Sequence, residues 1–290
     1  MKEDFFAIAI SFFEKTTHQR VSSIRPLGGG TANAVFLVNL DKVVRIKRPN
    51  QTDELFYSPG REYETILALN GMTPFCPIPK AYIFDPHTGN KVEAYVFSPE
   101  FKSHKGETFK RYQSCLETLK VMHRCQAALP SFRPIERFKR YKFLSAEEIR
   151  KDYEEEVLAK AIAAFKVSPV VFCHNDLHAA NFVLEEGSGK TRLLDLEMAG
   201  YNFEVFDLAS LISENNLDET MAIRLIHAFY GIDNVTDKTI EMVKDVMRFE
   251  DLLWYYWAKA RFLETIDQVF LDIAKEKMSH IARSMRKRFG

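Results

Sequence analysis

The first third of the chain alternates short apolar runs with polar turns. Five runs rich in β-branched and aromatic residues predict strands, at 21–24, 34–38, 43–46, 80–84 and 92–97. The turn signals of Asp85–Asn90 separate the last two runs. Residues 61–69 carry apolar positions at helical spacing and predict a short amphipathic helix. We therefore expect residues 1–97 to form a mostly antiparallel sheet with one such helix packed on it.

The apolar period changes after Ser98–Pro99, which we interpret as a hinge. Residues 107–128 predict a helix, and 145–165 predict another that begins with the capping box Ser145-x-x-Glu148. From Phe206 to the end the pattern is almost entirely helical. The sequence thus predicts an α+β protein with a small β-rich lobe at 1–97, a larger helical lobe at 98–290, and a ligand cleft between them.

Composition and charge narrow the function classes. The 290 residues include 40 Lys and Arg against 40 Asp and Glu, and a formal net charge of zero argues against a nucleic-acid partner. The four cysteines lack CxxC spacing and predict reduced thiols in a cytoplasmic protein. The apolar run 5–13 follows acidic rather than basic residues, which favours a first helix over an export signal, and no run is long enough for a membrane span.

One segment carries a chemical motif. His174, Asp176 and Asn181 form H-x-D-x-x-x-x-N, and Asp195 follows 14 residues after Asn181. The apolar runs between Asn181 and Asp195 predict a hairpin that returns Asp195 to the side of Asn181. These two side chains would then offer oxygen ligands to Mg²⁺, and Asp176 would accept a hydrogen bond from a hydroxyl group.

This spacing is the one that phosphoryl transfer requires, because the site must position ATP, neutralise charge with a metal and orient the attacking hydroxyl. Kinases with H-R-D-x-x-x-x-N and D-F-G segments carry the same pattern, with Asn175 here in place of Arg and Asp195-Leu196-Glu197 in place of D-F-G. Each Asp or Asn taken singly is more typical of a turn. The combination in this context favours the kinase interpretation.

The same segment resembles the aminoglycoside phosphotransferase and choline kinase superfamily, and within it the bacterial choline kinases most. The likeness is strong over 173–209, which holds both Cys173-His174-Asn175-Asp176-Leu177 and Leu194-Asp195-Leu196-Glu197. Two further segments are similar to that family, namely 134–141 (PIERFKRY) and the W-x-x-W helix at 253–257. The resemblance implies a protein-kinase-like fold whose first lobe binds the nucleotide.

The resemblance also implies roles for the motif residues. Asp176 would be the catalytic base or hydroxyl-orienting group, and Asn181 and Asp195 would hold Mg²⁺. Arg45 would grip the ATP phosphates, with Lys47 as the competing candidate because strand alternation places both on one face.

Further roles concern the first lobe and the linker. Glu62 would be the helix carboxylate that pairs with Arg45, and Glu64 is the alternative. Gly29, Gly30 and Thr31, in the run that begins at Gly28, would cover the phosphates, although that run alone indicates only a β-turn. The linker around Phe97 to Glu100 would meet the adenine, and His174 would hold the catalytic loop.

The acceptor pocket is predicted from one helix face. Glu250, Trp254 and Trp257 are spaced i, i+4 and i+7, so they share a face, and aromatic rings beside a carboxylate suit a quaternary ammonium group. A tryptophan pair at this spacing is also typical of an ordinary hydrophobic core. The family resemblance favours a pocket for a cationic substrate instead. Glu197 and Asp207 would add negative charge, with a structural role as the alternative for Asp207.

The sequence therefore predicts an ATP- and Mg²⁺-dependent kinase that phosphorylates choline or a related amino alcohol. The alternatives are another hydroxyl substrate, such as thiamine, ethanolamine, an aminoglycoside or a sugar, and a nucleotide-binding pseudokinase. A protein kinase is disfavoured because no Ala-Pro-Glu segment follows Asp195. Oligomeric state is not predicted.

Overall fold

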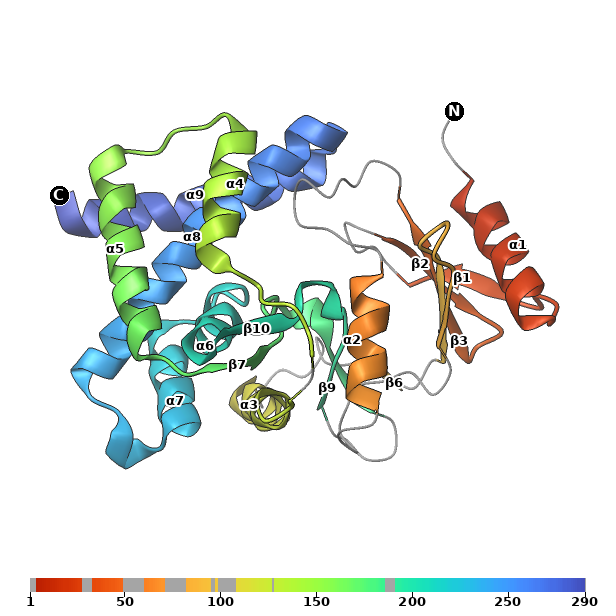
Figure 1. The fold of residues 1–290 in the computed structure, drawn as a ribbon, viewed down its shortest axis with the longest axis horizontal. Helices are drawn as coiled ribbons and strands as arrows, with labels where there is room; N and C mark the ends of the chain where they lie inside the picture. The colour runs from red at the N-terminus through yellow and green to blue at the C-terminus, as the bar shows by residue number, and fades with distance from the viewer. Residues whose placement is uncertain are drawn as a thin grey trace.

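A computed structural model shows two lobes joined near the middle of the molecule, with the N-terminal strands on one side and the C-terminal helices on the other (Figure 1). The structure describes residues 4–27, 33–48, 60–70, 82–94, 97–98, 108–126, 128–185 and 191–289. The antiparallel sheet and the helical remainder confirm the predicted α+β, kinase-like fold class.

The N-terminal lobe is built on a five-stranded antiparallel sheet in the order β1-β2-β3-β5-β4. Its strands are β1 Ile24–Pro26, β2 Asn33–Val38, β3 Lys42–Lys47, β4 Tyr82–Phe84 and β5 Lys91–Ala94. The tight turn before β5 is closed by the Asp85 amide, which donates to the Asn90 carbonyl at 3.0 Å. The register places Arg45 of β3 directly opposite Lys91 of β5.

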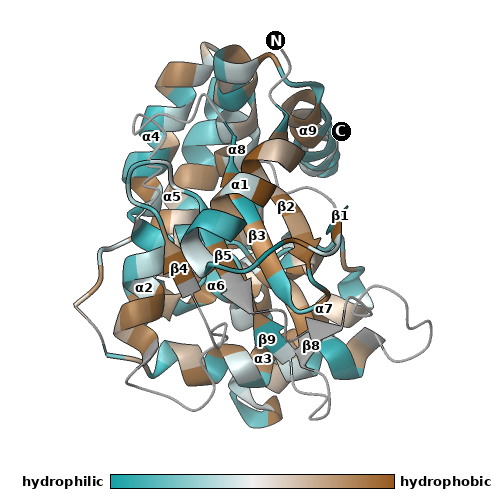
Figure 2. Ribbon diagram, turned by 90° about the vertical axis from the view of Figure 1, so that its right-hand side faces the viewer, coloured by the Kyte–Doolittle hydropathy of each residue, from teal (hydrophilic) through white to brown (hydrophobic). Residues whose placement is uncertain are grey.

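Helix α1 (Phe5–Thr17) covers this sheet, which confirms the predicted first helix. The Asp4 side chain caps its N-terminus by accepting from the amides of Phe6 and Ala7. Phe12 and Phe13 pack into an apolar cluster with β2 and β3, whose residues are largely hydrophobic (Figure 2). Burying these rings against the strands stabilises the lobe through the hydrophobic effect.

The second helix of this lobe, α2 (Arg61–Asn70), links the two lobes. It packs against the short 3₁₀ helix η4 (Leu196–Met198) of the C-terminal lobe. Ile66 and Leu69 are buried in the large C-terminal core cluster, and Glu62 is buried on the same helix. The helix therefore carries a charged side chain into the junction between the lobes.

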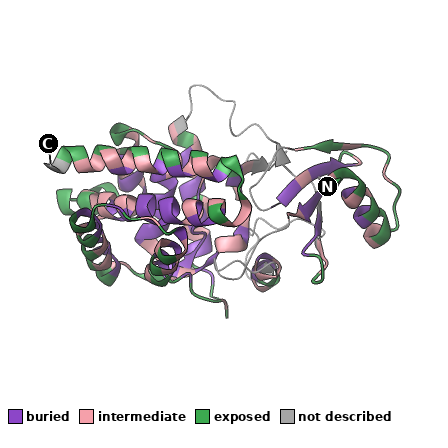
Figure 3. Cartoon of the chain, turned by 90° about the horizontal axis from the view of Figure 1, so that it is seen from above, coloured by how far each residue is buried: buried purple, intermediate pink, exposed green. Residues whose placement is uncertain are grey.

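The C-terminal lobe is a bundle around α8 (Asp237–Thr265), which packs on four neighbouring helices. Buried residues concentrate at its centre and exposed ones on the outer helices (Figure 3). The other helices are α3 Thr108–His123, α4 Pro134–Ser145, α5 Lys151–Val167, α6 Glu204–Ser213, α7 Glu219–Tyr230 and α9 Gln268–Phe289, and a further 3₁₀ turn, η5, spans Ile232–Asn234. None of the helices described is long and apolar enough to cross a membrane.

The predicted start of one helix was wrong. The helix expected over 145–165 begins later, at Lys151 (α5), and Ser145 is instead the last residue of α4. Ala146 adopts a left-handed conformation (φ 53°) and terminates α4, and the Ser145 hydroxyl donates to the Lys142 carbonyl at 2.8 Å. Ser145 is therefore at the C-terminal end of a helix rather than in a capping box.

Two small sheets frame the catalytic segment. In one, β7 (Val170–Cys173) pairs with β10 (Gly200–Phe203), a strand that the sequence did not reveal. In the other, β8 (Phe182–Glu185) lies between β6 (Phe97–Ser98) and β9 (Thr191–Leu193). The antiparallel pairing of β8 with β9 confirms the predicted hairpin arms.

Candidate active site

Asp207 of α6 binds the backbone of the loop that follows β7. The amides of His174 and Asn175 donate to the two oxygens of this carboxylate at 2.9 and 2.7 Å. Asn175 adopts a left-handed conformation (φ 67°), which is uncommon for a residue other than glycine and is typical of functional loops. The side-chain amide of Asn175 donates to the Met198 carbonyl at 2.9 Å and so ties this loop to η4.

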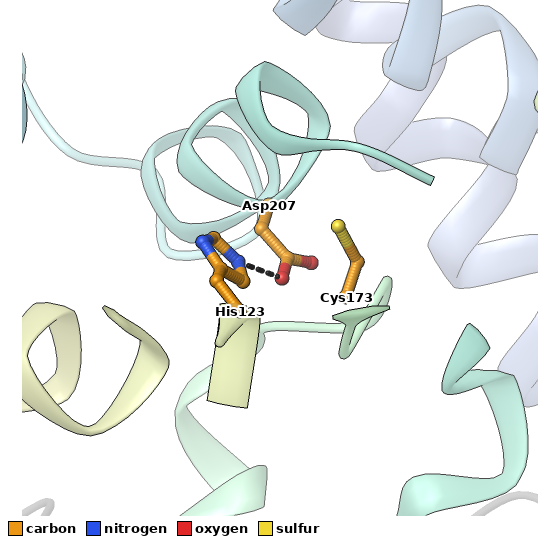
Figure 4. Close-up of side chains that lie close together, drawn as sticks. All are labelled: His123, Cys173 and Asp207. Carbon is orange, nitrogen blue, oxygen red and sulfur yellow. Dashed lines mark hydrogen bonds and ion pairs between the residues drawn. The ribbon is translucent and has the colours of Figure 1, made fainter. Parts of the chain in front are cut away.

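The Asp207 side chain is buried and bound by the protein's own groups, which favours the structural alternative, and its place in the acceptor pocket stays a prediction. Its side chain is fully buried, and besides the two loop amides it contacts His123 of α3, whose Nε2 lies 2.8 Å from Oδ2 (Figure 4). Burial lowers the pKa of His123, but Asp207 and Glu204 outweigh it and raise that pKa overall. The buried thiol of Cys173 points into the same group, and burial raises its pKa.

The loop brings Asp176 and Asn181 together. The side-chain amide of Asn181 donates to the Asp176 carboxylate at 3.2 Å and to the Asp176 carbonyl at 2.9 Å. His174 is fully buried, accepts from the Asp176 amide at 3.3 Å and lies 2.8 Å from the Leu194 carbonyl, which confirms that it holds the loop. Asp176 keeps 29% of its side chain exposed, so a hydroxyl group can reach it.

The hairpin carries Asp195 to the same place. Phe182 lies opposite Leu193, and the Leu194 amide donates to the Asn181 carbonyl at 2.8 Å. Asp195 then turns away from β9 in a left-handed conformation (φ 63°). Burial raises the pKa of Asp195, and the charge of Asp176 contributes to that increase, as expected for neighbouring carboxylates.

Arg45 and Glu62 form an ion pair at the lobe junction. Nη1 of Arg45 lies 3.3 Å from Oε1 of Glu62 and 3.9 Å from Oδ1 of Asp195. Glu62 is 2% exposed, whereas the alternative Glu64 is exposed on α2. The geometry therefore brings Arg45 and Glu62 together beside Asp195, and their role toward a nucleotide stays a prediction.

Sequence reasoning missed Lys91, the cross-strand neighbour of Arg45. Its Nζ forms a close ion pair with Glu62 and lies 3.4 Å from Oε1 of Glu197, and the residue is fully buried. Burial alone would raise the pKa of Glu62, but Lys91 and Arg45 outweigh it and lower that pKa to about 2. In the sequence, strand alternation indicates only that Lys91 and Val92 point to opposite faces of β5. The role of Lys91 becomes clear from the register of β5 with β3, which places it opposite Arg45.

Glu197 lies at this junction, and its part in the acceptor pocket stays a prediction. Its Oε1 lies 3.4 Å from Lys91 and accepts from the side-chain amide of Asn33 at 3.3 Å. Burial and the neighbouring Asp195 raise the pKa of Glu197 to about 7. The one-turn η4 helix places Glu197, two residues after Asp195, where its side chain reaches Lys91 and Asn33 of the N-terminal sheet.

The oxygens of Glu62, Asp195 and Glu197 come within 4.8 Å of one another, and Oδ1 of Asp195 is buried without a hydrogen-bond partner in the described part of the chain. Carboxylate and amide oxygens are the ligands that Mg²⁺ takes beside a phosphate. Asp195 thus fits a magnesium ion, whereas Glu62 and Glu197 are already paired with Lys91. His123, Cys173 and Asp207 also come together, but the Asp207 carboxylate is already bound by the two loop amides and by His123.

The predicted face of α8 exists, and it is more deeply buried than an open pocket wall. Glu250 is fully buried, Trp254 is 7% exposed, and the rings of Trp254 and Trp257 meet edge to face at 5.8 Å. Trp254 also packs near Phe132, at 6.4 Å between ring centroids, and Trp257 near Phe270, at 5.5 Å. These contacts are those of an ordinary core, and the pocket role of the tryptophan pair stays a prediction.

Glu250 is the unusual member of that face. Neither of its carboxylate oxygens has a hydrogen-bond partner among the residues that the structure describes, and burial raises its pKa well above the ordinary value. Charged neighbours that the sequence did not single out lie around it, namely Glu214, Asp251 and Lys277. A buried carboxyl group without a partner is costly unless it serves a ligand.

Part of the predicted nucleotide site falls outside the described residues. Gly29, Gly30, Thr31 and Glu100 lie there, so the structure does not test their roles. Phe97 is described only as backbone, where β6 pairs with β8.

Comparisons with known proteins agree with this geometry. The model of the phosphotransferase enzyme family matches residues 23–237, and the chain belongs to that family. A segment is 47% identical over 47 residues to ethanolamine kinase 2 of Rattus norvegicus, covering 16% of this chain and 12% of that protein. The segments shared with the first three such relatives thus span less than a fifth of their length.

Solved structures extend the likeness to nearly the whole fold. Choline kinase LicA from Streptococcus pneumoniae has a TM-score of 0.72 at 20% identity, and the match covers 97% of this chain and 100% of that one. A choline/ethanolamine kinase family protein from Mesorhizobium loti has a TM-score of 0.73 at 22% identity, covering 97% and 94%. These comparisons confirm the superfamily resemblance and the kinase-like fold.

Proposed function

We propose that this protein transfers the γ-phosphoryl group of ATP to the hydroxyl group of choline or a related amino alcohol. The observation that carries the proposal is the grouping of Asp176, Asn181 and Asp195 at the junction of the lobes. This grouping offers a hydroxyl acceptor beside oxygen ligands for a cation, which is what phosphoryl transfer needs.

The nucleotide would lie against the N-terminal lobe. Arg45 is within reach of both Glu62 and Asp195, so its guanidinium is positioned to meet phosphate oxygens. Asn181 donates its amide nitrogen to Asp176, an orientation that leaves its oxygen for a cation with Asp195. Magnesium held there would neutralise the charge that develops on the transferred group. A LicA structure similar in fold, at a TM-score of 0.68, is a complex with AMP, which supports nucleotide binding.

Asp176 would orient the acceptor hydroxyl and accept its proton. Its side chain is 29% exposed, and Asn181 fixes its direction by a hydrogen bond of 3.2 Å. A positioned general base contributes roughly 10²–10⁴-fold to the rate.

The acceptor would carry a positive charge. Glu250 is a buried carboxyl group that has no hydrogen-bond partner among the described residues, and Trp254 and Trp257 present aromatic rings on the same helix. A cation beside such rings gains both charge pairing and cation–π attraction. The names of these relatives give ethanolamine or choline as their substrate, which supports an amino alcohol over a sugar.

The proposal is tested by ADP release with Mg-ATP and a panel of alcohols: choline, ethanolamine, thiamine, kanamycin and glucose. We expect turnover with choline or ethanolamine and none with glucose. Asp176→Asn should lower turnover by about 10³-fold and still bind Mg-ATP. Asp233→Asn, a matched change at an exposed position on η5, should leave turnover unchanged.

Two results would contradict the proposal. Binding of Mg-ATP without turnover of any alcohol would indicate a pseudokinase, and turnover with kanamycin alone would indicate an aminoglycoside as acceptor. Equal turnover by Asp176→Asn and the unchanged protein would remove Asp176 from its proposed role.

A further inference from the structure

A lysine lies on the buried face of the last helix. Phe270, Ala274, Lys277 and Ile281 of α9 are all at most 3% exposed and follow one another at helical spacing. Three of these positions pack as ordinary core, and the fourth brings an ammonium group into it. A buried lysine is rare unless it is paired, so its partners matter.

The partners of Lys277 are carboxylates from two other helices. Nζ lies 2.5 Å from Oε1 of Glu214, just after α6, and 3.5 Å from Oδ1 of Asp251 on α8. Burial lowers the pKa of Lys277, but Glu214 and Asp251 outweigh it and raise that pKa, so the ammonium stays charged. Oδ1 of Asp251 also lies 3.0 Å from Nδ1 of His280 and accepts from Ser213 at 3.1 Å.

The cluster holds more negative groups than positive ones. Glu214 and Asp251 are paired with Lys277, whereas the fully buried Glu250 has no hydrogen-bond partner in the described chain. Lys277 and Glu214 are both among the charges that act on the Glu250 pKa, so the three groups are neighbours. One carboxyl group is thus left for a cation that the protein itself does not supply.

The cluster also adjoins the catalytic loop. The side-chain amide of Asn215 donates to the Leu177 carbonyl at 2.7 Å, and the charge of Asp176 contributes to the raised pKa of Glu214. A substrate whose hydroxyl reaches Asp176 would therefore have its far end near Glu214, Glu250 and Lys277.

We propose that Lys277 is a specificity-determining residue of the acceptor pocket. Its ammonium offsets one of the two negative charges of Glu214 and Asp251 and repels a substrate cation, so it limits how strongly Glu250 and this cluster attract a charged acceptor. This inference rests on the proposed function, because it concerns how that pocket selects its alcohol.

The test compares charged alcohols with their neutral analogues: choline with 3,3-dimethylbutan-1-ol, and ethanolamine with propan-1-ol. The measured quantity is the ratio of kcat/KM for the charged and neutral member of a pair. Lys277→Met removes the repulsion and should raise this ratio about tenfold, since a charge a few ångströms away in a partly buried site acts strongly. Lys277→Arg should keep the ratio within about twofold.

Controls separate this role from a structural one. Lys275→Met removes a lysine from the exposed side of α9 and should leave the ratio unchanged. Asp251→Asn keeps Lys277 but removes one of its counter-ions, so the ratio should fall, opposite to Lys277→Met. Because the two variants move the ratio in opposite directions, either one carries the test if the other does not fold.

An unchanged ratio in the folded Lys277 or Asp251 variant, or an equal loss for charged and neutral alcohols, would overturn this inference alone. Turnover of none of these alcohols by the unchanged protein would defeat the proposed function and this inference together.

Discussion

Arg45 and Lys91 lie directly opposite each other on β3 and β5 and share one carboxylate, that of Glu62. The shared carboxylate is shielded from solvent, because it is buried between the sheet and α2. Lys91 extends the network to Glu197 in the other lobe. This chain of charges connects the N-terminal sheet to the segment that carries Asp195.

Lys91→Met should weaken both folding and activity. The change leaves Glu197 without its cation and Glu62 with Arg45 alone, and removing one partner of a buried ion pair costs about 3 kcal/mol or more of unfolding free energy. Because Glu197 adjoins Asp195, we also expect turnover to fall by at least about tenfold. Urea unfolding and kcat measure the two effects.

The matched control for this prediction is Lys42→Met. Lys42 lies on β3 and pairs with the exposed Asp41, and such surface pairs are worth less than about 1 kcal/mol. If Lys91→Met were as stable and active as the unchanged protein, the network would have no part in holding the lobes together.

His123 makes stability depend on pH with a defined sign. Asp207 and Glu204 of α6 raise its pKa in the folded state above the ordinary value of 6.5, and Cys173 is its other neighbour. A raised pKa contributes stability that is complete below 6.5 and is lost as the pH rises through the folded-state pKa. As the pH rises above 6.5, the unfolding free energy should therefore decrease more in the unchanged protein than in His123→Gln.

The control for His123 is His87→Gln, at an exposed turn position. Its pH dependence should match that of the unchanged protein. A His123→Gln variant with an unaltered pH profile would show that the imidazole does not titrate with folding, contrary to the pairing with Asp207.

Gly200 should tolerate no side chain. A Cβ atom there would lie 2.5 Å from the Pro130 carbonyl oxygen, because the segment 130–132 runs against β10 with hydrogen bonds from Tyr201 and Phe132. Gly200→Ala must displace backbone, and we expect a loss of about 2 kcal/mol in unfolding free energy. Gly60→Ala is the control, since its nearest atom would be 3.9 Å away. Equal stability of the two variants in urea would contradict this close approach.

The core of the site could be predicted because its residues are close in sequence. Asp176, Asn181 and Asp195 are separated by one loop and one hairpin, so motif spacing and strand pattern suffice to bring them together. The role of Lys91 could not be predicted in this way, because its position beside Arg45 depends on the register of β3 with β5. Lys277 could not either, since it appears in sequence as one more lysine of a charged helix.

Two acidic residues show the limit of prediction from residue type. Asp207 and Glu197 were expected to add negative charge to the acceptor pocket, with a structural role as the alternative for Asp207. Their direction is set by tertiary contacts, since loop amides and His123 bind Asp207, and Lys91 binds Glu197. Residue type predicts which chemistry a side chain can perform, and packing decides where it performs it.

Binding of a cationic alcohol should release a proton from Glu250. Burial and the neighbouring Glu214 raise its pKa and so favour the protonated form in the free protein, while a substrate cation favours the carboxylate. The groups that face it are Glu214, Asp251, Lys277 and Asp207. His280 of α9 contacts Asp251 beside it. Affinity for choline should therefore increase as the pH rises toward the pKa of Glu250 in the free protein. Calorimetry in buffers of different ionisation enthalpy measures the protons released on binding. It should report proton release with choline but not with 3,3-dimethylbutan-1-ol. Glu250→Gln should abolish that difference, and the same proton release in this variant would assign the titration to another group.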